Sequence, residues 1–297
     1  MKQVRPAAVH ERRAALRLLL QQDAAAEREV RLAGLLDQMQ HGELDPAGLL
    51  ITEDQRGAIL AIPLAGAGGL IWSPVCPSLA EAQALVEVAV AWLRTQGTRI
   101  VQALVSLPQP SPSNWLEGCG FRAVTQLWTL ARDTHSPLAL AKRAVWPPLH
   151  YEPYDPKQSQ IFEDTLQASY VDSLDCPEVN GLRSPAEVLA GHRMQGEYEP
   201  TRWWLVRQKS DPVGVVIQVD HPIKAERELA YLGLVPTARG RGLGYAILAR
   251  VIECAAQEMI ARVVLGVDAR NEPALRLYRA AGFAEVHRQR VYLRVEL

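Results

Sequence analysis

The chain has little net charge and few cysteines, and both shortages exclude classes of protein. Its 32 Lys and Arg residues against 33 Asp and Glu leave a net charge of −1, so there is no bulk electrostatic attraction to nucleic acid. The four cysteines show no CxxC spacing, which argues against a zinc knuckle or a disulfide framework and suits a reducing compartment. We therefore expect a cytoplasmic protein with no metal site and no nucleic-acid partner.

Signals for a membrane are also lacking. The N-terminus does not show the basic region, apolar core and small-residue cleavage site of a secretory signal. Residues 57–80 carry no charge and are long enough to span a bilayer, but three prolines and four glycines interrupt them. Two strands joined by a turn fit this segment better, so no membrane association is expected.

What the chain does contain is enough length for two domains and a repeat that relates them. Its 297 residues correspond to two domains of roughly 150 residues each. Shifting the chain by 162 positions aligns four elements of the two halves: Gly120-Phe121 with Gly282-Phe283, strand 100–106 with 262–268, the Pro74 turn with Pro236, and helix 78–96 with 240–258. We predict a duplication, with domains at 1–132 and 149–297 and a linker at 133–148. A single large α/β domain is the alternative, because such folds also repeat strand–helix units.

The second half alternates strands and helices, which predicts an α/β fold in which each domain is a twisted mixed sheet flanked by helices. Strands are expected at 201–208, 212–219, 228–235 and 261–268, helices at 157–170, 184–196, 240–258 and 271–282, and two closing strands at about 283–288 and 289–296.

The segment 234–246 ends a strand, turns through three alternate glycines and begins a helix. Gly240, Gly242 and Gly244 let backbone amides approach a ligand, and amides at a helix N-terminus favour an anion. Arg239 and Arg241 add charge suited to a pyrophosphate. The segment lacks the Gly-Lys-Ser/Thr ending of a P-loop and the GxGxxG spacing of a Rossmann fingerprint.

Arg239, Gly242 and Gly244 match the Arg/Gln-x-x-Gly-x-Gly/Ala motif of the GNAT superfamily of acyl-CoA-dependent N-acyltransferases, which the chain resembles over about 149–297. Asn271, Leu277-Tyr278 and Gly282-Phe283 follow in the family's order. The resemblance implies that acetyl-CoA is the cosubstrate, with its pantetheine arm along the backbone of Leu234 and Val235 and beside Asn271, and its sulfur near Tyr278. The full expected coenzyme-binding set is Leu234, Val235, Arg239, Gly240, Arg241, Gly242, Leu243, Gly244, Tyr245, Asn271 and Tyr278.

Transfer of an acetyl group to an amine needs a base for the nucleophile and an acid for the departing thiolate. Glu228 begins the strand that leads to the phosphate turn, and strand alternation places it on one face with Ala230, Leu232 and Leu234. We expect Glu228 to act as the base and Tyr278 as the acid. The alternatives are an exposed carboxylate near Arg227, a tyrosine packed on the sheet and, for Asn271, a helix N-cap that is compatible with ligand contact.

The acceptor site is less well marked. The residues between the first two helices of the second half, where GNAT proteins usually place a substrate-covering loop, are Tyr170, Asp172, Asp175, Cys176, Pro177 and Glu178. Three carboxylates and a tyrosine would suit a cationic amine, whereas the simpler interpretation is a solvated acidic loop with a buried cysteine. His192 and His221 have no metal-ligand spacing and are interpreted as solvated or structural.

The first half has lost the chemistry of the second. At the positions of Arg239, Gly242 and Gly244 it has Pro77, Ala80 and Ala82, and Leu116 replaces Tyr278. An inactive first half and an active second half are similar to the arrangement of mycothiol synthase-type acetyltransferases, a likeness of architecture that does not establish mycothiol chemistry.

The predicted function is direct transfer of acetyl from acetyl-CoA to a primary amine of a small molecule or peptide. It would proceed in a ternary complex without an acyl-enzyme, in a monomer or homodimer. The alternative is a non-catalytic acyl-CoA-binding or scaffold protein.

Overall fold

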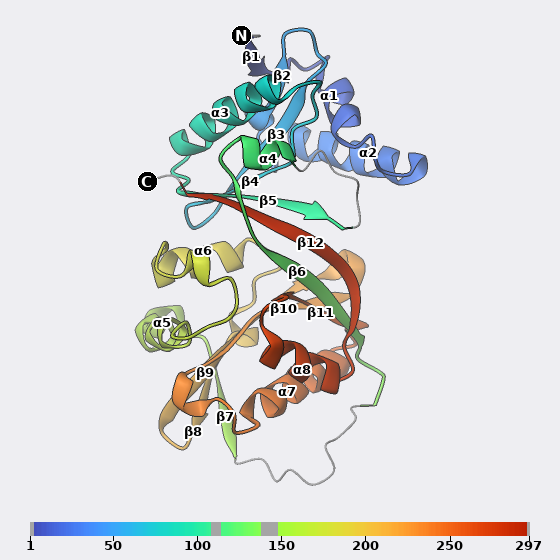
Figure 1. The fold of residues 1–297 in the computed structure, drawn as a ribbon. Coiled ribbons are helices and arrows are strands. Elements are labelled where there is room, and N and C mark those ends of the chain that lie inside the picture. Colours follow the sequence, from blue (N-terminus) through green and yellow to red (C-terminus); the bar gives the residue numbers. More distant parts are fainter. Residues whose placement is uncertain (1–2, 108–113, 138–147, 296–297) are drawn as a thin grey trace. The chain divides into compact units, whose positions relative to one another are not determined.

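The computed structural model describes residues 3–107, 114–137 and 148–295, drawn as a ribbon in Figure 1. The chain forms two compact units, Met1–Val124 with Arg290–Leu297, and Thr125–Gln289. Each unit is a mixed sheet with helices on both faces, which confirms the predicted α/β class. Most of the expected linker, 138–147, lies outside the described residues.

The first unit contains the elements of the first repeat. They are β1 (Val4–Pro6), α1 (Arg12–Leu19), α2 (Ala25–His41), β2 (Leu49–Thr52), β3 (Ala58–Leu64), β4 (Gly68–Ile71), α3 (Leu79–Thr95), β5 (Ile100–Ser106) and α4 (Asn114–Gly118). Alternate strand residues enter two cores: Leu49 and Ile51 pack on the side of α1 and α2, and Leu50 packs on the side of α3. The uncharged segment 57–80 forms β3 and β4 with a turn between them, as predicted.

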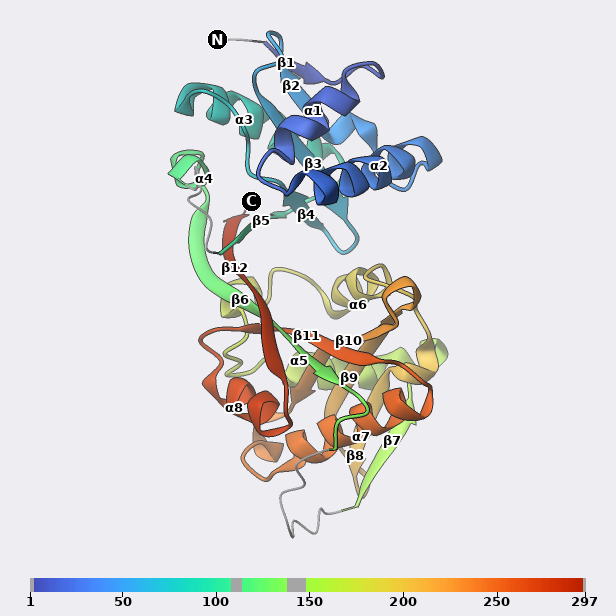
Figure 2. The ribbon, with the colours of Figure 1, turned by 90° about the vertical axis from the view of Figure 1, so that its right-hand side faces the viewer.

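The second unit has the same plan. Its elements are β6 (Arg122–Asp133, which starts in the first unit), β7 (Leu149–Pro153), α5 (Ser159–Ala168), α6 (Pro185–Arg193), β8 (Trp204–Gln208), β9 (Asp211–His221), β10 (Glu226–Leu234), α7 (Leu243–Gln257), β11 (Arg262–Asp268) and α8 (Glu272–Ala280). Trp203 and Leu205 enter the core under α5 and α6, while Trp204 and Val206 enter the core under α7 and α8. Figure 2 shows these two helix pairs on opposite faces of the sheet.

The repeat is visible in the element bounds. Strand β11 begins and ends 162 positions after β5, and β12 (Ala284–Val295) begins and ends 162 positions after β6. Helices α7 and α8 follow α3 and α4 in the same order. Because strands and helices recur in one register, the predicted duplication describes the fold.

The last strand of each repeat, however, passes into the other unit. Strand β6 pairs with β11 over seven residue pairs from Arg262↔Asp133 to Asp268↔Leu127, and Tyr292 of β12 lies in the core around α3. Residues 125–132 therefore belong to the second unit and 290–297 to the first, unlike the predicted boundaries. The two expected closing strands are one strand, because 284–295 contains no Gly, Pro or Asn that would turn the chain.

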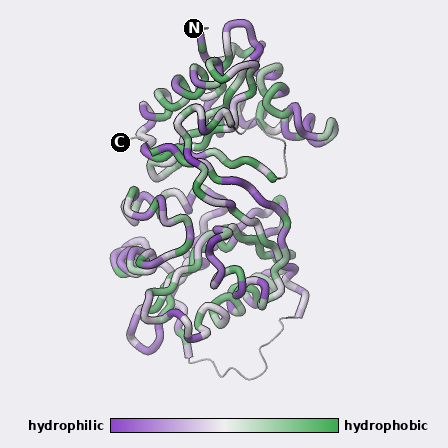
Figure 3. The backbone as a smooth tube through the Cα atoms, in the orientation of Figure 1, coloured by the Kyte–Doolittle hydropathy of each residue, from purple (hydrophilic) through white to green (hydrophobic). Residues whose placement is uncertain are grey.

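Hydrophobic and hydrophilic residues alternate along the helices, and long hydrophobic stretches lie in the strands at the centre of each unit (Figure 3). Strand β9, which has helices on both faces, is buried along most of its length, whereas the first half of β12 is exposed. Among the residues that the structure describes, every helix falls short of the length and hydrophobicity that a membrane crossing requires.

We predict that Tyr292→Ala, although located in the second repeat, destabilises the first unit. The side chain is 1% exposed in the α3 core, and removing a buried aromatic ring costs about 3 kcal/mol. Hydrogen exchange followed by mass spectrometry should show faster exchange in α3 and β5. Leu248→Ala in α7 is the control and should affect the second unit; faster exchange confined to β10 and β11 in the Tyr292 variant would contradict the prediction.

Candidate functional site

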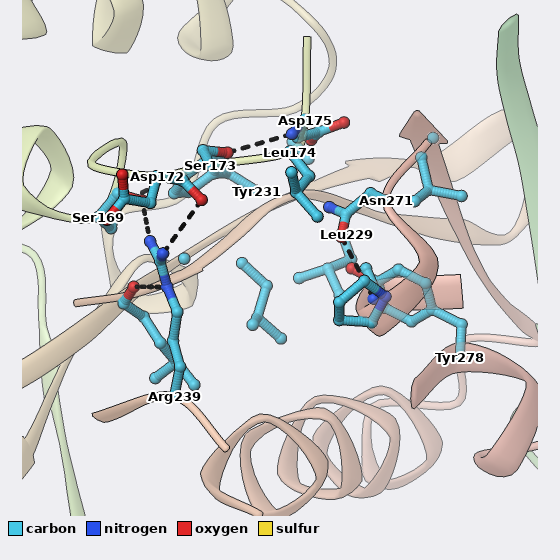
Figure 4. A pocket seen from close by; sticks show the side chains of 18 residues that line it. Ser169, Asp172, Ser173, Leu174, Asp175, Leu229, Tyr231, Arg239, Asn271 and Tyr278 are labelled. Carbon is cyan, nitrogen blue, oxygen red and sulfur yellow. Dashed lines mark hydrogen bonds between the residues drawn. The ribbon is translucent and has the colours of Figure 1, made fainter. Parts of the chain in front are cut away.

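The site lies where two neighbouring parallel strands separate. Strands β10 and β11 pair over only three residue pairs, and the last is Glu228↔Val264. Beyond this point a pocket of about 180 Å³ opens between them, lined by residues from 169–175, 229–234 and 266–278 (Figure 4). The pocket thus occupies a gap inside the sheet, with unpaired strand edges on its walls.

The path of β10 accounts for the gap. Its pairing with β9 continues to Leu234, but the register shifts between Leu229 and Tyr231, and such a bulge bends a strand. The Tyr231 hydroxyl lies 2.8 Å from Ser169 Oγ, on the far side of the bend. A side chain at Gly233 would meet the Tyr231 ring at 2.5 Å, so only glycine permits this packing.

The bulge corrects the predicted face of Glu228. Ala230 and Tyr231 pack on the α5/α6 side, while Leu232 and Leu234 pack on the α7/α8 side. The expected common face of Glu228, Ala230, Leu232 and Leu234 was therefore wrong, because the extra residue of the bulge shifts the alternation by one position. Glu228 precedes the bulge, is half-buried, and is not among the residues that line the pocket.

The glycine-rich segment forms the open helix N-terminus that the sequence predicts. Gly240 and Gly242 have φ of +70° and +78°, and Gly242 is the N-cap of α7 without a side-chain cap. Within the described part of the chain, the amides of residues 240–244 donate no hydrogen bond. Five consecutive N–H groups are thus available to an anion.

Arg239 has a different environment from the one expected. Its guanidinium donates to the carbonyl oxygens of Leu234 at 3.0 Å, Asp172 at 3.3 Å and Ser169 at 2.9 Å. It therefore fastens the 169–172 loop to the end of β10 (Figure 4). Arg241 is exposed and donates to Gln208 Oε1 at 2.6 Å.

The other expected coenzyme residues lie in different surroundings. Leu234 lines the pocket, whereas the Val235 N–H is already bonded to the Val213 carbonyl at 3.0 Å. Leu243 and Tyr245 belong to the α7/α8-side core, Leu243 within it and Tyr245 packed against it. A Cβ at Gly244 would lie 3.3 Å from Leu277, so this glycine also serves the close approach of α7 to α8.

Tyr278 and Asn271 both reach the pocket from α8 and its start (Figure 4). Asn271 Oδ1 accepts the Ala274 amide at 3.3 Å, which confirms the N-cap and leaves its amide nitrogen on the pocket side. Tyr278 is 7% exposed and packs on Phe283. Burial, and then the charge of Asp175, raise the pKa of Tyr278 above its usual value, so the hydroxyl stays protonated at neutral pH.

The carboxylates of the acidic loop have different surroundings and partners. Asp172 and Asp175 are exposed and line the pocket, and Asp175 Oδ1 accepts the Asp268 amide at 3.1 Å. Glu178 is held by Arg270 through bonds of 2.6 and 2.9 Å, so it is not available to a cationic ligand. Burial raises the pKa of the Cys176 thiol to about 12, which excludes a thiolate at neutral pH.

Sequence reasoning missed three residues beside the pocket. Tyr231 and Ser169 line it, and His221 donates or accepts at 2.9 Å from Glu228 through Nε2. Nothing in the sequence signals Ser169 and Tyr231, because their contact spans 62 positions and depends on the bulge. His221 stands seven positions before Glu228 across a hairpin, a spacing that could have suggested the pair.

In the first unit, the N-terminus of α3, the helix that aligns with α7, is capped by a side chain. Ser78 caps α3 by accepting the Glu81 amide at 3.3 Å, whereas Gly242 has no side chain to offer. Leu116, at the position of Tyr278, is fully buried in the α3 core. Within the described residues, no group of three or more His, Cys, Asp or Glu side chains is placed to hold a metal ion.

Comparison with known proteins shows what the chain is similar to. Residues 167–283 match the acetyltransferase (GNAT) family. The fold of the whole chain is similar to that of a tandem GNAT protein.

Particular relatives are informative about architecture. The chain is 28% identical over 193 residues to a mycothiol acetyltransferase of Beutenbergia cavernae, a match that spans 60% of this chain and 61% of that relative. A GCN5-related N-acetyltransferase structure from Sphaerobacter thermophilus has a TM-score of 0.65 at 19% identity, over 99% of this chain and 97% of that one. A tandem GNAT protein from the clavulanic acid biosynthesis pathway has a TM-score of 0.55 at 15% identity, over 99% and 98%.

We predict that Arg239→Ala loosens the 169–172 loop. It removes a charged donor from three carbonyls, and hydrogen bonds to charged groups contribute about 2 kcal/mol. The melting temperature should fall, and amide exchange should accelerate in 169–175. Arg241→Ala, which removes an exposed arginine two residues away, is the matched control and should change neither; equal effects of the two variants would contradict the clamp.

We also predict slow alkylation of Cys176. With a pKa of about 12, its thiolate fraction at pH 8 is about 10⁻⁴ and rises about tenfold per pH unit. Iodoacetamide labelling read by peptide mass spectrometry should be at least about 100-fold slower in the folded protein than in urea. Equal rates in the two states would contradict the raised pKa of Cys176.

Proposed function

We propose that the protein is an acetyltransferase that moves the acetyl group of acetyl-CoA directly to a primary amine. The observation that carries the proposal is the gap between β10 and β11, which ends at Glu228 and lies beside Tyr278 and the free amides of 240–244. An extended arm can fill an interrupted sheet by pairing with its open edges, as an added strand does.

The coenzyme would enter from the α7/α8 side. Its pyrophosphate would accept hydrogen bonds from the amides of 240–244, favoured by the helix dipole of α7. Arg241 adds a charge at this terminus, and Arg239 acts through the loop that it holds. Asn271 offers its side-chain nitrogen to the pantetheine amides inside the gap.

The acceptor would approach from the α5/α6 side, on which Tyr231 packs. Glu228 lies before the bulge and Tyr231 lies after it. Glu228, directly or through water, takes the proton from the attacking ammonium or amine. The amine nitrogen then forms a bond to the thioester carbon, the C–S bond breaks, and acetamide and coenzyme A thiol are the products. Direct attack without an acyl-enzyme is consistent with Cys176, whose thiol remains protonated.

Tyr278 would stabilise the leaving sulfur. A tyrosine hydroxyl (pKa about 10) is a weaker acid than a thiol (about 8.5), so complete proton transfer to the sulfur is uphill. Burial raises the pKa of Tyr278, which makes its hydroxyl a still weaker acid than the thiol. The hydroxyl is therefore suited to donate a hydrogen bond to the developing thiolate, which then takes its proton from solvent.

A small-molecule acceptor is favoured over a protein, because the curated relative is named for mycothiol acetylation and the pocket measures about 180 Å³. The competing proposal, a non-catalytic acyl-CoA-binding or scaffold protein, shares the amide nest but does not require Tyr278 in the gap and Glu228 next to it.

We predict that Tyr278→Phe and Glu228→Gln each lower kcat for acetyl transfer about 10²-fold or more, because each removes a proton-transfer or hydrogen-bonding group used in the transition state. Thiol release from acetyl-CoA with a panel of primary amines measures this. Gly242→Glu should abolish coenzyme binding in calorimetry under either proposal. Slow release that is equal in wild type and Tyr278→Phe with every amine would favour the binding protein.

A further inference from the structure

His221 is the last residue of β9, and both edges of its ring are occupied. Its Nε2 lies 2.9 Å from Glu228 Oε2. On the other edge, an added Cβ at Gly196 would lie 3.1 Å from His221 Cε1 and 3.3 Å from Nδ1. The imidazole therefore fills the space between Gly196 and Glu228.

The sheet register brings His221 to Glu228. His221 faces Glu226 across the β9–β10 ladder, and Glu228 faces Val219, so His221 and Glu228 are diagonal neighbours on one face. The turn Pro222–Lys224 joins the two strands. The bulge begins only after Glu228, so it leaves this pair in regular pairing.

The chain at Gly196 holds the other side of the ring. The Glu197 amide donates to the Asp220 carbonyl at 2.8 Å, and this bridge lays residue 196 against β9. A Cβ at Gly196 would come within 2.7 Å of the same carbonyl oxygen, so the position requires glycine. Nε2 is therefore the ring nitrogen that contacts a carboxylate, while Nδ1 lies on the side of Gly196.

We propose that His221 is a positioning residue for Glu228: its Nε2–H donates to Oε2 and leaves Oε1 directed to the acceptor amine. The inference rests on the proposed function, in which Glu228 is the base. Within the described part of the chain, Oε1 of Glu228 accepts no hydrogen bond. One oxygen held and one free is the arrangement that a carboxylate base needs, since a freely rotating carboxylate would spend most of its time misdirected.

The other charged groups near His221 and Glu228 form ion pairs with different residues or do not contact the imidazole. On β9, Asp220 is bound by Arg202 and Arg227; on β10, Glu226 is bound by Arg262. Burial lowers the pKa of His192 on α6, an effect that the Gln195 bond and the Glu228 charge oppose and the Arg183 charge reinforces. The remaining charged neighbours are Lys224 in the turn and Glu197 in the bridge. Glu228 is thus the carboxylate in contact with the imidazole.

The test compares His221→Gln, which keeps an N–H donor that does not titrate, with His221→Ala, which removes the donor. We expect His221→Ala to lower kcat about tenfold to hundredfold and to leave KM for acetyl-CoA within about twofold. His221→Gln should retain kcat within about threefold, because its side chain still offers an N–H donor. Unchanged kcat in His221→Ala would overturn the proposal. So would an equal loss in both variants, because ring packing against Gly196 would then explain the effect.

Failure of the proposed function is recognised separately. If Glu228→Gln transfers acetyl as fast as wild type, Glu228 is not the base and the proposed mechanism fails first. If Glu228→Gln is inactive while His221→Ala is not, only the inference about His221 fails.

The contact itself has a readout that needs no activity. The ¹⁵N chemical shifts of the imidazole, assigned with His221→Gln, report which nitrogen carries the proton. We expect the Nε2–H tautomer in wild type above neutral pH and loss of this preference in Glu228→Ala. A wild-type ring protonated on Nδ1 alone would overturn the proposal, even in a protein that acetylates none of the amines tested.

Discussion

The separation of β10 from β11 after Glu228 and Val264 is the constraint on which the site depends. Two parallel strands normally stay paired, so each must be held from its outer side to stay apart. Strand β10 is held by β9 as far as Leu234, and β11 is held by β6 over its whole length. Since β6 begins in the first repeat, the gap in the second unit requires a strand that the second repeat does not supply.

The exchange of β6 and β12 gives the first repeat a structural role, although it lacks the glycine-rich terminus and the tyrosine of the second repeat. Its helix α3 is closed by the Ser78 cap, and Leu116 fills the position that Tyr278 occupies in the second unit. What remains useful is the scaffold: β6 borders β11, and Tyr292 of β12 completes the first core. Each repeat thus contributes a strand to the other unit, whereas the residues of the pocket described here come from the second unit.

The bulge in β10 determines which face of the sheet each of its side chains reaches. It sends Leu232 and Leu234 toward α7 and α8, where the amide nest lies, and Tyr231 toward α5 and α6. The loop between α5 and α6 is fastened at both ends, by Arg239 at Ser169 and by Arg270 at Glu178. Under the proposed function, coenzyme and acceptor would reach the last paired residues from these two faces, the geometry that direct transfer requires.

The sequence by itself determined the elements, the duplication and the open helix N-terminus, because periodicity, the 162-position register and the alternate glycines are local or repeated signals. It also marked Glu228, Asn271 and Tyr278, which the structure places at or next to one gap. Only the tertiary structure decided the strand exchange, the face of each β10 residue, the clamp role of Arg239 and the contact of His221 with Glu228. Each of these depends on which strand edge or loop lies opposite a residue, and a bulge of one residue is enough to reverse a face that alternation alone assigns.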